Sequence, residues 1–176
     1  MAFCQALSER CSVNMTLPTE AQWEWACRAG SDTDFWFGDI NSDFSKNENL
    51  ADQMLRKMAV SGIDPQPVSE NSWVYKYYTF MPREDNVNDG QMTISDVANY
   101  EPNAWGLYDM HGNVAEFTRS TYAPYPYKDE PKSGDNKVVR GGAWNYRANH
   151  STAYSRESNL AWQPANNVGF RVVIEE

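Results

Sequence analysis

The sequence contains few cysteines and histidines. Its 176 residues include only three cysteines, Cys4, Cys11 and Cys27. An odd number excludes a fully paired disulfide framework, so buried or free thiols are expected, with a single Cys4–Cys27 bridge as the alternative. The two histidines, His111 and His150, lack the spacing of zinc ligands relative to these cysteines. We therefore expect neither a disulfide scaffold nor a zinc site.

Basic residues and long apolar runs are also scarce. The chain has 15 Lys and Arg against 24 Asp and Glu, a formal net charge of −9, and a pI of about 4.7. This balance excludes the basic surface of a protein that binds nucleic acid or an anionic membrane. No apolar run reaches the roughly 20 residues of a transmembrane helix. The first ten residues, MAFCQALSER, lack the basic and apolar regions of a signal peptide, so the compartment stays open.

Aromatic residues, in contrast, are abundant: seven Trp, ten Tyr and seven Phe. Together with weak periodicity, they predict loops held by large rings, within one domain that has its own core. Residues 61–92 show no sustained period and predict an ordered loop or insertion, with a short strand at Trp73–Phe80. Apolar runs predict two further strands, at Val138–Arg140 and Val168–Ile174.

Two helices are predicted near the N-terminus. Residues 2–10 place their apolar side chains at helical spacing, without an N-cap before them. In LPTEAQWEWACRAG, Thr19 and Gln22 form a capping box, and Gly30 is placed for a left-handed end. This pattern predicts a helix from about Glu20 to Ala29.

Four separated segments carry a family resemblance: LPTEAQWEWACRAG (17–30), PNAWGLYDMHGNVAEF (102–117), VVRGGAWNY (138–146) and NNVGFRVV (166–173). In this order they resemble the domain of the formylglycine-generating enzymes, also called sulfatase-modifying factors. The resemblance implies a single domain over residues 1–176, truncated at its N-terminal side. It also implies an α+β fold, irregular, loop-rich and C-type-lectin-like, with few short strands and two or so N-terminal helices.

The resemblance further implies a site after the double glycine Gly141–Gly142. In the catalytic members two cysteines there bind copper(I), activate oxygen and support oxidation of a substrate cysteine to formylglycine. The matching positions here are Tyr146 and Ser151, and neither supplies the soft thiolate that copper(I) requires. We therefore expect no copper and no formylglycine synthesis by that mechanism.

The residues around these positions predict a ligand cleft. Aromatic, guanidinium and amide groups suit contact with a peptide, protein or carbohydrate ligand. The candidates are Trp144, Tyr146, Arg147, Asn149, His150 and Ser151. Trp144 is also expected as a core ring, and Arg171 as a buried guanidinium. The alternative is that this stretch only holds loops together. A base role for His150 beside Ser151 would need geometry that adjacency in sequence does not provide.

Two oxygen-rich loop sets predict calcium sites, because calcium takes carboxylate, amide and backbone carbonyl oxygens on irregular loops. The resemblance implies these ligands: Asp109, Gly112, Val114 and Glu116 for the first set, and Asn49, Leu50, Asp89 and Gln91 for the second. The alternative for both is turn residues that bond their own backbone. The long segment between Asn49 and Asp89 could also keep the halves of the second set apart.

The predicted function is a non-catalytic, calcium-stabilised domain that binds a peptide or carbohydrate. One alternative is an oxidase of the formylglycine-generating or sulfoxide-synthase type, working with the missing N-terminal segment. Another is a diversified ligand-binding protein that varies over residues 145–167. The family often works outside the cytoplasm, but this chain shows no export signal.

Overall fold

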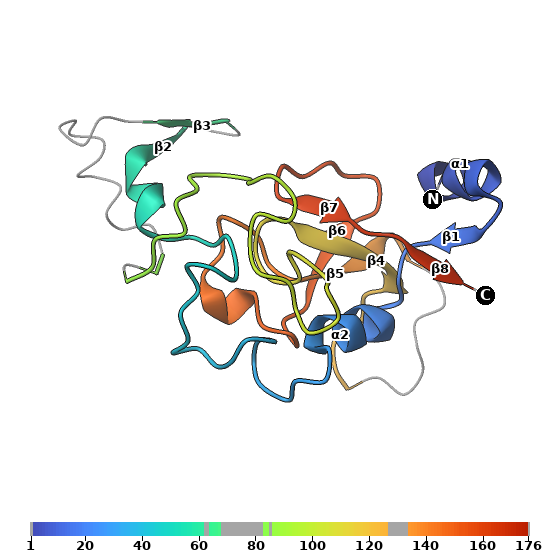
Figure 1. Ribbon diagram of the computed structural model, residues 1–176. Helices are drawn as coiled ribbons and strands as arrows, with labels where there is room; N and C mark the ends of the chain where they lie inside the picture. The colour runs from blue at the N-terminus through green and yellow to red at the C-terminus, as the bar shows by residue number, and fades with distance from the viewer. Residues whose placement is uncertain (1, 62–63, 68–82, 85, 127–133, 176) are drawn as a thin grey trace.

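The computed structural model describes residues 2–61, 64–67, 83–84, 86–126 and 134–175. The fold is α+β and loop-rich, as predicted, with two N-terminal α-helices and short sheets (Figure 1). The helices are α1 (Ala2–Cys11), α2 (Glu20–Arg28) and the 3₁₀-helices η1 (Gln53–Lys57) and η3 (Ala148–His150). The strands are β1 (Asn14–Thr16), β2 (Met58–Ser61), β3 (Asp64–Pro67), β4 (Ala115–Thr121), β5 (Asn136–Arg140), β6 (Glu157–Leu160), β7 (Val168–Phe170) and β8 (Val173–Glu175).

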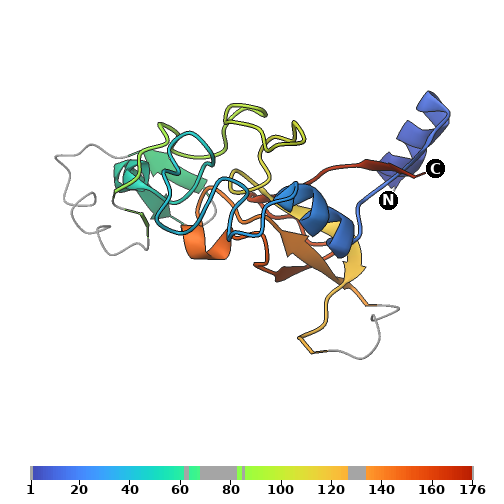
Figure 2. The same ribbon diagram turned by 60° about the horizontal axis from the view of Figure 1, so that its bottom comes forward.

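The central sheet has four strands in the order β6-β5-β4-β7. Strand β5 is antiparallel to both β4 and β6, whereas β7 runs parallel to β4. Helix α2 contacts β4 and β5 and lies along one side of this sheet (Figure 2). The antiparallel pair β2–β3 stands apart, at the end of the molecule away from the termini (Figure 1).

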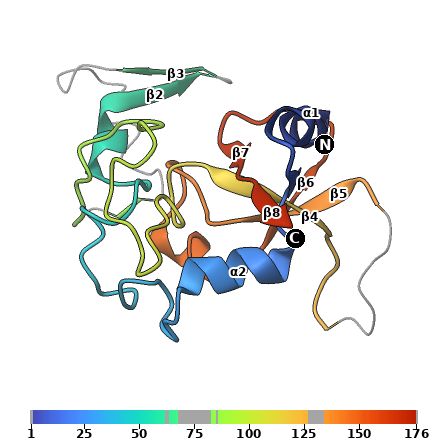
Figure 3. The same ribbon diagram turned by 45° about the vertical axis from the view of Figure 1, so that its right-hand side comes forward.

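A second pairing brings the two ends of the chain together. Strand β8 pairs antiparallel with β1, with Asn14 opposite Glu175, and α1 lies beside this pair (Figure 3). The prediction of one continuous strand over Val168–Ile174 is therefore wrong. The segment forms two strands, β7 and β8, which belong to different sheets. Arg171 lies between β7, which pairs with β4, and β8, which pairs with β1. Its guanidinium donates hydrogen bonds to the Glu116 carboxylate.

Helix α2 begins as the sequence predicts. Thr19 Oγ1 accepts a hydrogen bond from the Gln22 backbone (3.2 Å), and the Gln22 side chain accepts one from the Thr19 backbone (2.8 Å). The helix ends at Arg28, one residue earlier than expected. Ala29 takes the left-handed conformation (φ 46°), followed by Gly30 at φ 95°. The predicted start of the helix is thus confirmed, and its end lies one residue before the predicted one.

The core consists of several small clusters instead of one large aliphatic centre. Trp23 and Cys27 of α2 pack against Met110. Elsewhere, the centroid of the Phe35 ring lies 5.2 Å from that of the Phe37 ring. The Phe35 ring also makes an edge-to-face contact with the Phe44 ring. These rings hold irregular segments together, as the aromatic content predicts.

All three cysteines are free: Cys4 and Cys27 are buried and Cys11 is exposed, so the alternative bridge does not form. Among the described residues no helix is long and apolar enough to cross a membrane. The strand predicted at Trp73–Phe80 lies outside the described residues.

Candidate functional site

The double glycine at the end of β5 lets two segments approach closely. Gly142 has φ 72°, and a Cβ built on it would lie 2.2 Å from Ser151 Oγ and 2.8 Å from Ser151 Cα. Only glycine fits both this conformation and this contact. Ser151 is fully buried beneath Gly142, and its Oγ has no hydrogen-bond partner in the described part of the chain.

The predicted cleft residues divide into buried and exposed groups. Trp144 is buried against Ala51 and Leu55, in agreement with the prediction of a core ring. Neither Trp144 nor Ser151 faces solvent. Four remain accessible at least in part: Tyr146, Arg147, Asn149 and His150. We call these four the 146–150 surface.

The 146–150 surface is fixed by polar contacts at its edges. Tyr146 Oη donates to Glu157 Oε2 over 2.9 Å, and its ring lies 6.1 Å from that of His150. Burial and the Glu157 carboxylate raise the pKa of Tyr146 to about 12. Arg147 Nε lies 3.2 Å from Glu84 Oε1, while half of the Arg147 side chain stays exposed. The surface therefore offers a phenol ring, a guanidinium, an amide and an imidazole.

The histidine that contacts Ser151 is His111, which is fully buried. Its Nδ1 donates to the Ser151 carbonyl (2.6 Å), and its Nε2 accepts from the Trp36 backbone (3.2 Å) and lies 3.5 Å from Cys27 Sγ. Burial lowers the pKa of His111 to about 4 and raises that of Cys27 to about 12. The pair is therefore neutral, which fits a structural role and not an activated thiolate. The distance of 84 residues between them hid this contact from sequence inspection.

In the first predicted calcium set, the main carboxylate already has a cationic partner. Glu116 on β4 accepts from Arg171 Nε (2.5 Å) and Nη2 (2.6 Å), and from Trp23 Nε1 (2.7 Å). Arg171 Nη2 also donates to the Asp109 carbonyl (3.3 Å). Asp109 Oδ2 accepts from the Ala98 backbone, and its buried Oδ1 has no hydrogen-bond partner within the described ranges. Arg171 thus balances the charge of Glu116, and calcium at the first set stays a prediction.

The first set also includes two residues predicted to contribute backbone carbonyls. Gly112 forms a parallel bridge with Asn49, and a Cβ at Gly112 would lie 2.2 Å from the Asn49 carbonyl oxygen. Val114 packs its side chain against Gly169 of β7. The structure therefore places the first set directly beside the second.

In the second set, the structure brings the two halves together despite the long segment between them. Asp89 Oδ2 accepts from the Leu50 backbone (3.0 Å), and Oδ1 accepts from the Gln91 backbone (2.7 Å). The Asn49 side chain donates to the Thr93 carbonyl (2.7 Å). Burial raises the pKa of Asp89 to about 6. The set thus combines a desolvated carboxylate with amide and carbonyl oxygens.

Two further acids near this set had no sequence signal, since charged residues are rarely fully buried. Glu48 is completely buried, and neither of its carboxylate oxygens has a hydrogen-bond partner among the described residues. Burial, followed by the charges of Asp89 and Glu84, raises the pKa of Glu48 above its usual range. Asp52 is also buried, and its Oδ2 accepts from the Asp89 backbone (2.6 Å).

The donor types of the second set fit calcium, which prefers mixed oxygen ligands. In the described ranges, no group of three or more His, Cys, Asp or Glu side chains is arranged to hold a metal ion. An ion here would therefore depend on the Asn49 amide and on the Leu50 and Gln91 carbonyls as well as on carboxylates. Both carboxylate oxygens of Glu48 lie beside this set without a hydrogen-bond partner among the described residues.

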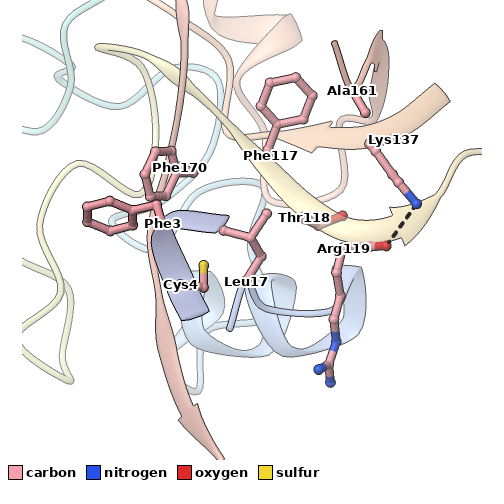
Figure 4. Close-up of a pocket in the computed structure, with 9 residues that line it drawn as sticks. All are labelled: Phe3, Cys4, Leu17, Phe117, Thr118, Arg119, Lys137, Ala161 and Phe170. Carbon is pink, nitrogen blue, oxygen red and sulfur yellow. Dashed lines mark hydrogen bonds between the residues drawn. The ribbon is translucent and has the colours of Figure 1, made fainter. Parts of the chain in front are cut away.

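Two of the cavities lined by described residues differ in what lies beside them. One, of about 420 Å³, adjoins the second set and is lined in part by Asp89, Tyr100 and Glu101. The other, of about 290 Å³, lies between α1 and the central sheet and is lined largely by Phe3, Leu17, Phe117 and Phe170 (Figure 4). Only the first connects with the polar groups described above.

Comparison with known proteins fixes the family. A family model described as the sulfatase-modifying factor enzyme 1-like domain matches residues 1–176. The chain belongs to this sulfatase-modifying factor family. The resemblance carried by the four sequence segments is thereby confirmed.

Curated relatives within the sulfatase-modifying factor family include a protein named as inactive and others named as formylglycine-generating enzymes. Inactive C-alpha-formylglycine-generating enzyme 2 of Mus musculus is 31% identical over 88% of the chain, and formylglycine-generating enzyme of the same species is 26% identical over 97%. The chain spans 41% and 40% of their lengths, respectively.

Solved structures support the fold. PvdO from Pseudomonas aeruginosa matches with a TM-score of 0.70 and 23% identity, over 99% of this chain and 58% of that chain. Treponema denticola variable protein 1 matches with a TM-score of 0.63 and 24% identity, over 91% of this chain and 47% of that chain. The C-type-lectin likeness stays a prediction.

Proposed function

We propose that this chain is a non-catalytic member of the sulfatase-modifying factor family that holds one calcium ion at the second set. We further propose that it presents the 146–150 surface to a peptide or carbohydrate ligand. The observation that carries the non-catalytic assignment is the replacement of both thiol positions by Tyr146 and Ser151. The similarity to a relative named as inactive agrees with it.

The chemistry of the two replacement residues does not suit copper(I). Copper(I) prefers thiolate and thioether ligands. The Tyr146 hydroxyl is held by Glu157 with a raised pKa, and the Ser151 hydroxyl is buried beneath Gly142. The nearby thiol of Cys27 is buried and protonated at neutral pH. No described group near the double glycine therefore takes over the role of the missing thiolates.

Calcium at the second set would be held by the Asn49 amide oxygen, the Asp89 carboxylate and the Leu50 and Gln91 carbonyls. The ion would supply a structural positive charge between two loops that carry excess negative charge. We do not extend the proposal to the first set, because Arg171 already provides the cation for Glu116.

The calcium loops and the 146–150 surface are joined through the backbone. The Ala51 amide donates to the Tyr146 carbonyl (2.8 Å), and the Glu84 amide donates to the Ala51 carbonyl. The Arg147 side chain then reaches back to the Glu84 carboxylate (3.2 Å). Ordering of these loops by calcium would therefore also order the ligand surface, so ligand affinity should depend on calcium.

The test is thermal unfolding of the protein with calcium and with a chelator. At a calcium concentration 100 times the dissociation constant, binding stabilises by about 2.7 kcal/mol. For a chain of this size that raises Tm by about 5–11 °C. Asp89→Asn should abolish the shift, whereas Asp96→Asn, which alters an exposed acid on the same stretch, should keep it. An unchanged Tm in wild-type protein would overturn the calcium assignment.

The non-catalytic assignment has a separate assay. Protein loaded with copper(I) is incubated with oxygen and a cysteine-containing peptide, and the peptide mass is measured. We expect the mass of the peptide to stay that of the cysteine form, with no formylglycine product. Conversion above a copper-only control would refute the assignment.

A further inference from the structure

The most anomalous group outside the predicted ligand sets is the carboxylate of Glu48. It is fully buried, and both of its oxygens lack a hydrogen-bond partner in the part of the chain that the structure describes. A buried charged group without partners is strongly unfavourable, so proteins pair it, protonate it or bind a cation to it.

The surroundings of Glu48 are acidic. The segment 48–52 runs beside residues 84 and 86–89, with a parallel bridge between Asp52 and Glu84 and a hydrogen bond from the Glu84 amide to the Ala51 carbonyl. Asp89 and Glu84 are near enough for their charges to act on Glu48. Among the described residues, only Glu84 of these carboxylates has an ion-pair partner, Arg147.

Hydrogen bonds already satisfy the other acids of this cluster. Asp52 accepts from the Met54 and Asp89 backbones, and Asp89 accepts from the Leu50 and Gln91 backbones. Glu48 receives no such hydrogen bond from any residue that the structure describes. It therefore stands out as the one carboxylate of the cluster whose oxygens are all available to an ion.

We propose that Glu48 is an additional ligand of the calcium ion, so that two carboxylates, Glu48 and Asp89, share it. This inference rests on the calcium binding proposed above and adds a residue outside the ligand set implied by family resemblance. With both carboxylates the charge of the ion is neutralised. Calcium affinity rises with the number of charged ligands, so Glu48 sets how tightly the site binds.

The cavity of about 420 Å³ gives the ion a path to Asp89. Asp89 and Tyr100 line it, and the buried Tyr100 hydroxyl likewise lacks a hydrogen-bond partner among the described residues. Because Tyr100 lines the same cavity as Asp89, we expect terbium bound beside Asp89 to be excited through Tyr100 and to emit.

The test compares wild-type protein with Glu48→Gln, Asp89→Asn and Glu101→Gln. Glu101 is exposed at the rim of the same cavity and serves as the matched control. Calcium dissociation constants come from calorimetry, and terbium emission reports occupancy independently. We expect Glu48→Gln to weaken calcium binding by at least about tenfold, with Glu101→Gln unchanged. Without calcium, Glu48→Gln should be no less stable than wild type, because it removes an unpaired buried acid.

The outcomes separate this inference from the proposed function. If wild-type protein binds neither calcium nor terbium, the proposed calcium site itself fails. If wild type binds and Asp89→Asn does not, but Glu48→Gln binds as tightly as wild type, calcium remains and the Glu48 inference is overturned. In that case Glu48 is a neutral buried acid.

Discussion

Two arginine–glutamate pairs in this protein differ in surroundings, and that difference makes a quantitative prediction. The side chains of Arg171 and Glu116 are 24% and 8% exposed, whereas those of Arg119 and Glu175 are 33% and 30% exposed. Glu116 also depends on Arg171 for two of its three hydrogen bonds. We therefore expect Arg171→Met to be much more damaging than Arg119→Met.

The size of the effect follows from the charge left behind. Removing one partner of a buried pair costs about 3–5 kcal/mol. Because Trp23 still donates to Glu116 and Arg171 is partly exposed, we expect about 2–4 kcal/mol. A loss of 3 kcal/mol lowers Tm by about 6–12 °C for a domain of this size. Arg119→Met, in a more solvated pair, should cost about 0–1 kcal/mol.

The assay is urea unfolding of both variants under identical calcium and salt conditions. Combining Arg171→Met with Glu116→Gln should restore part of the stability, because the uncompensated charge is then gone while Trp23 keeps an acceptor. Equal stability of Arg171→Met and Arg119→Met would refute the reasoning that burial of Glu116 makes the difference.

Two other predictions concern the stretch around the double glycine. Gly142→Ala forces a Cβ to 2.2 Å from Ser151 Oγ at φ 72°, and should cost at least about 1–3 kcal/mol in urea unfolding; no loss would mean that the two segments can separate freely. Burial lowers the pKa of His111 to about 4 in the folded protein, whereas it is about 6.5 in the unfolded chain. The unfolded chain therefore binds the proton first, and the free energy of unfolding should fall by about 3 kcal/mol as pH drops from 6.5 to 4. His111→Gln should flatten this pH dependence; a slope equal to that of wild type would contradict it.

Local sequence signals predicted local structure well. The capping box of Thr19 and Gln22, the helix over residues 2–11 and the strand ending at Arg140 all follow from short-range patterns and are present. The strand at 168–174 was predicted as continuous because its apolar run gives no sign that the chain changes partner at Arg171. A change of sheet depends on tertiary pairing, which periodicity does not record.

The site was less accessible to sequence reasoning. Family positions located Asp89 and Asn49, and the structure joins their loops. Glu48 had no signal because acids are normally assigned to the surface. The family resemblance places Ser151 in a cleft, at the position of a catalytic cysteine, yet the close approach of Gly142 buries it. In both cases burial is set by segments far apart in the sequence.

The pairing of β1 with β8 has a mechanical consequence. Asn14 lies opposite Glu175, so tension applied at the two ends of the chain acts first on the outermost pair and then on Met15–Ile174 and Thr16–Val173 in turn. Such a geometry peels bonds one at a time instead of shearing them together. Helix α1 and β8 would therefore detach at low force, before the strands of the four-stranded sheet separate from one another.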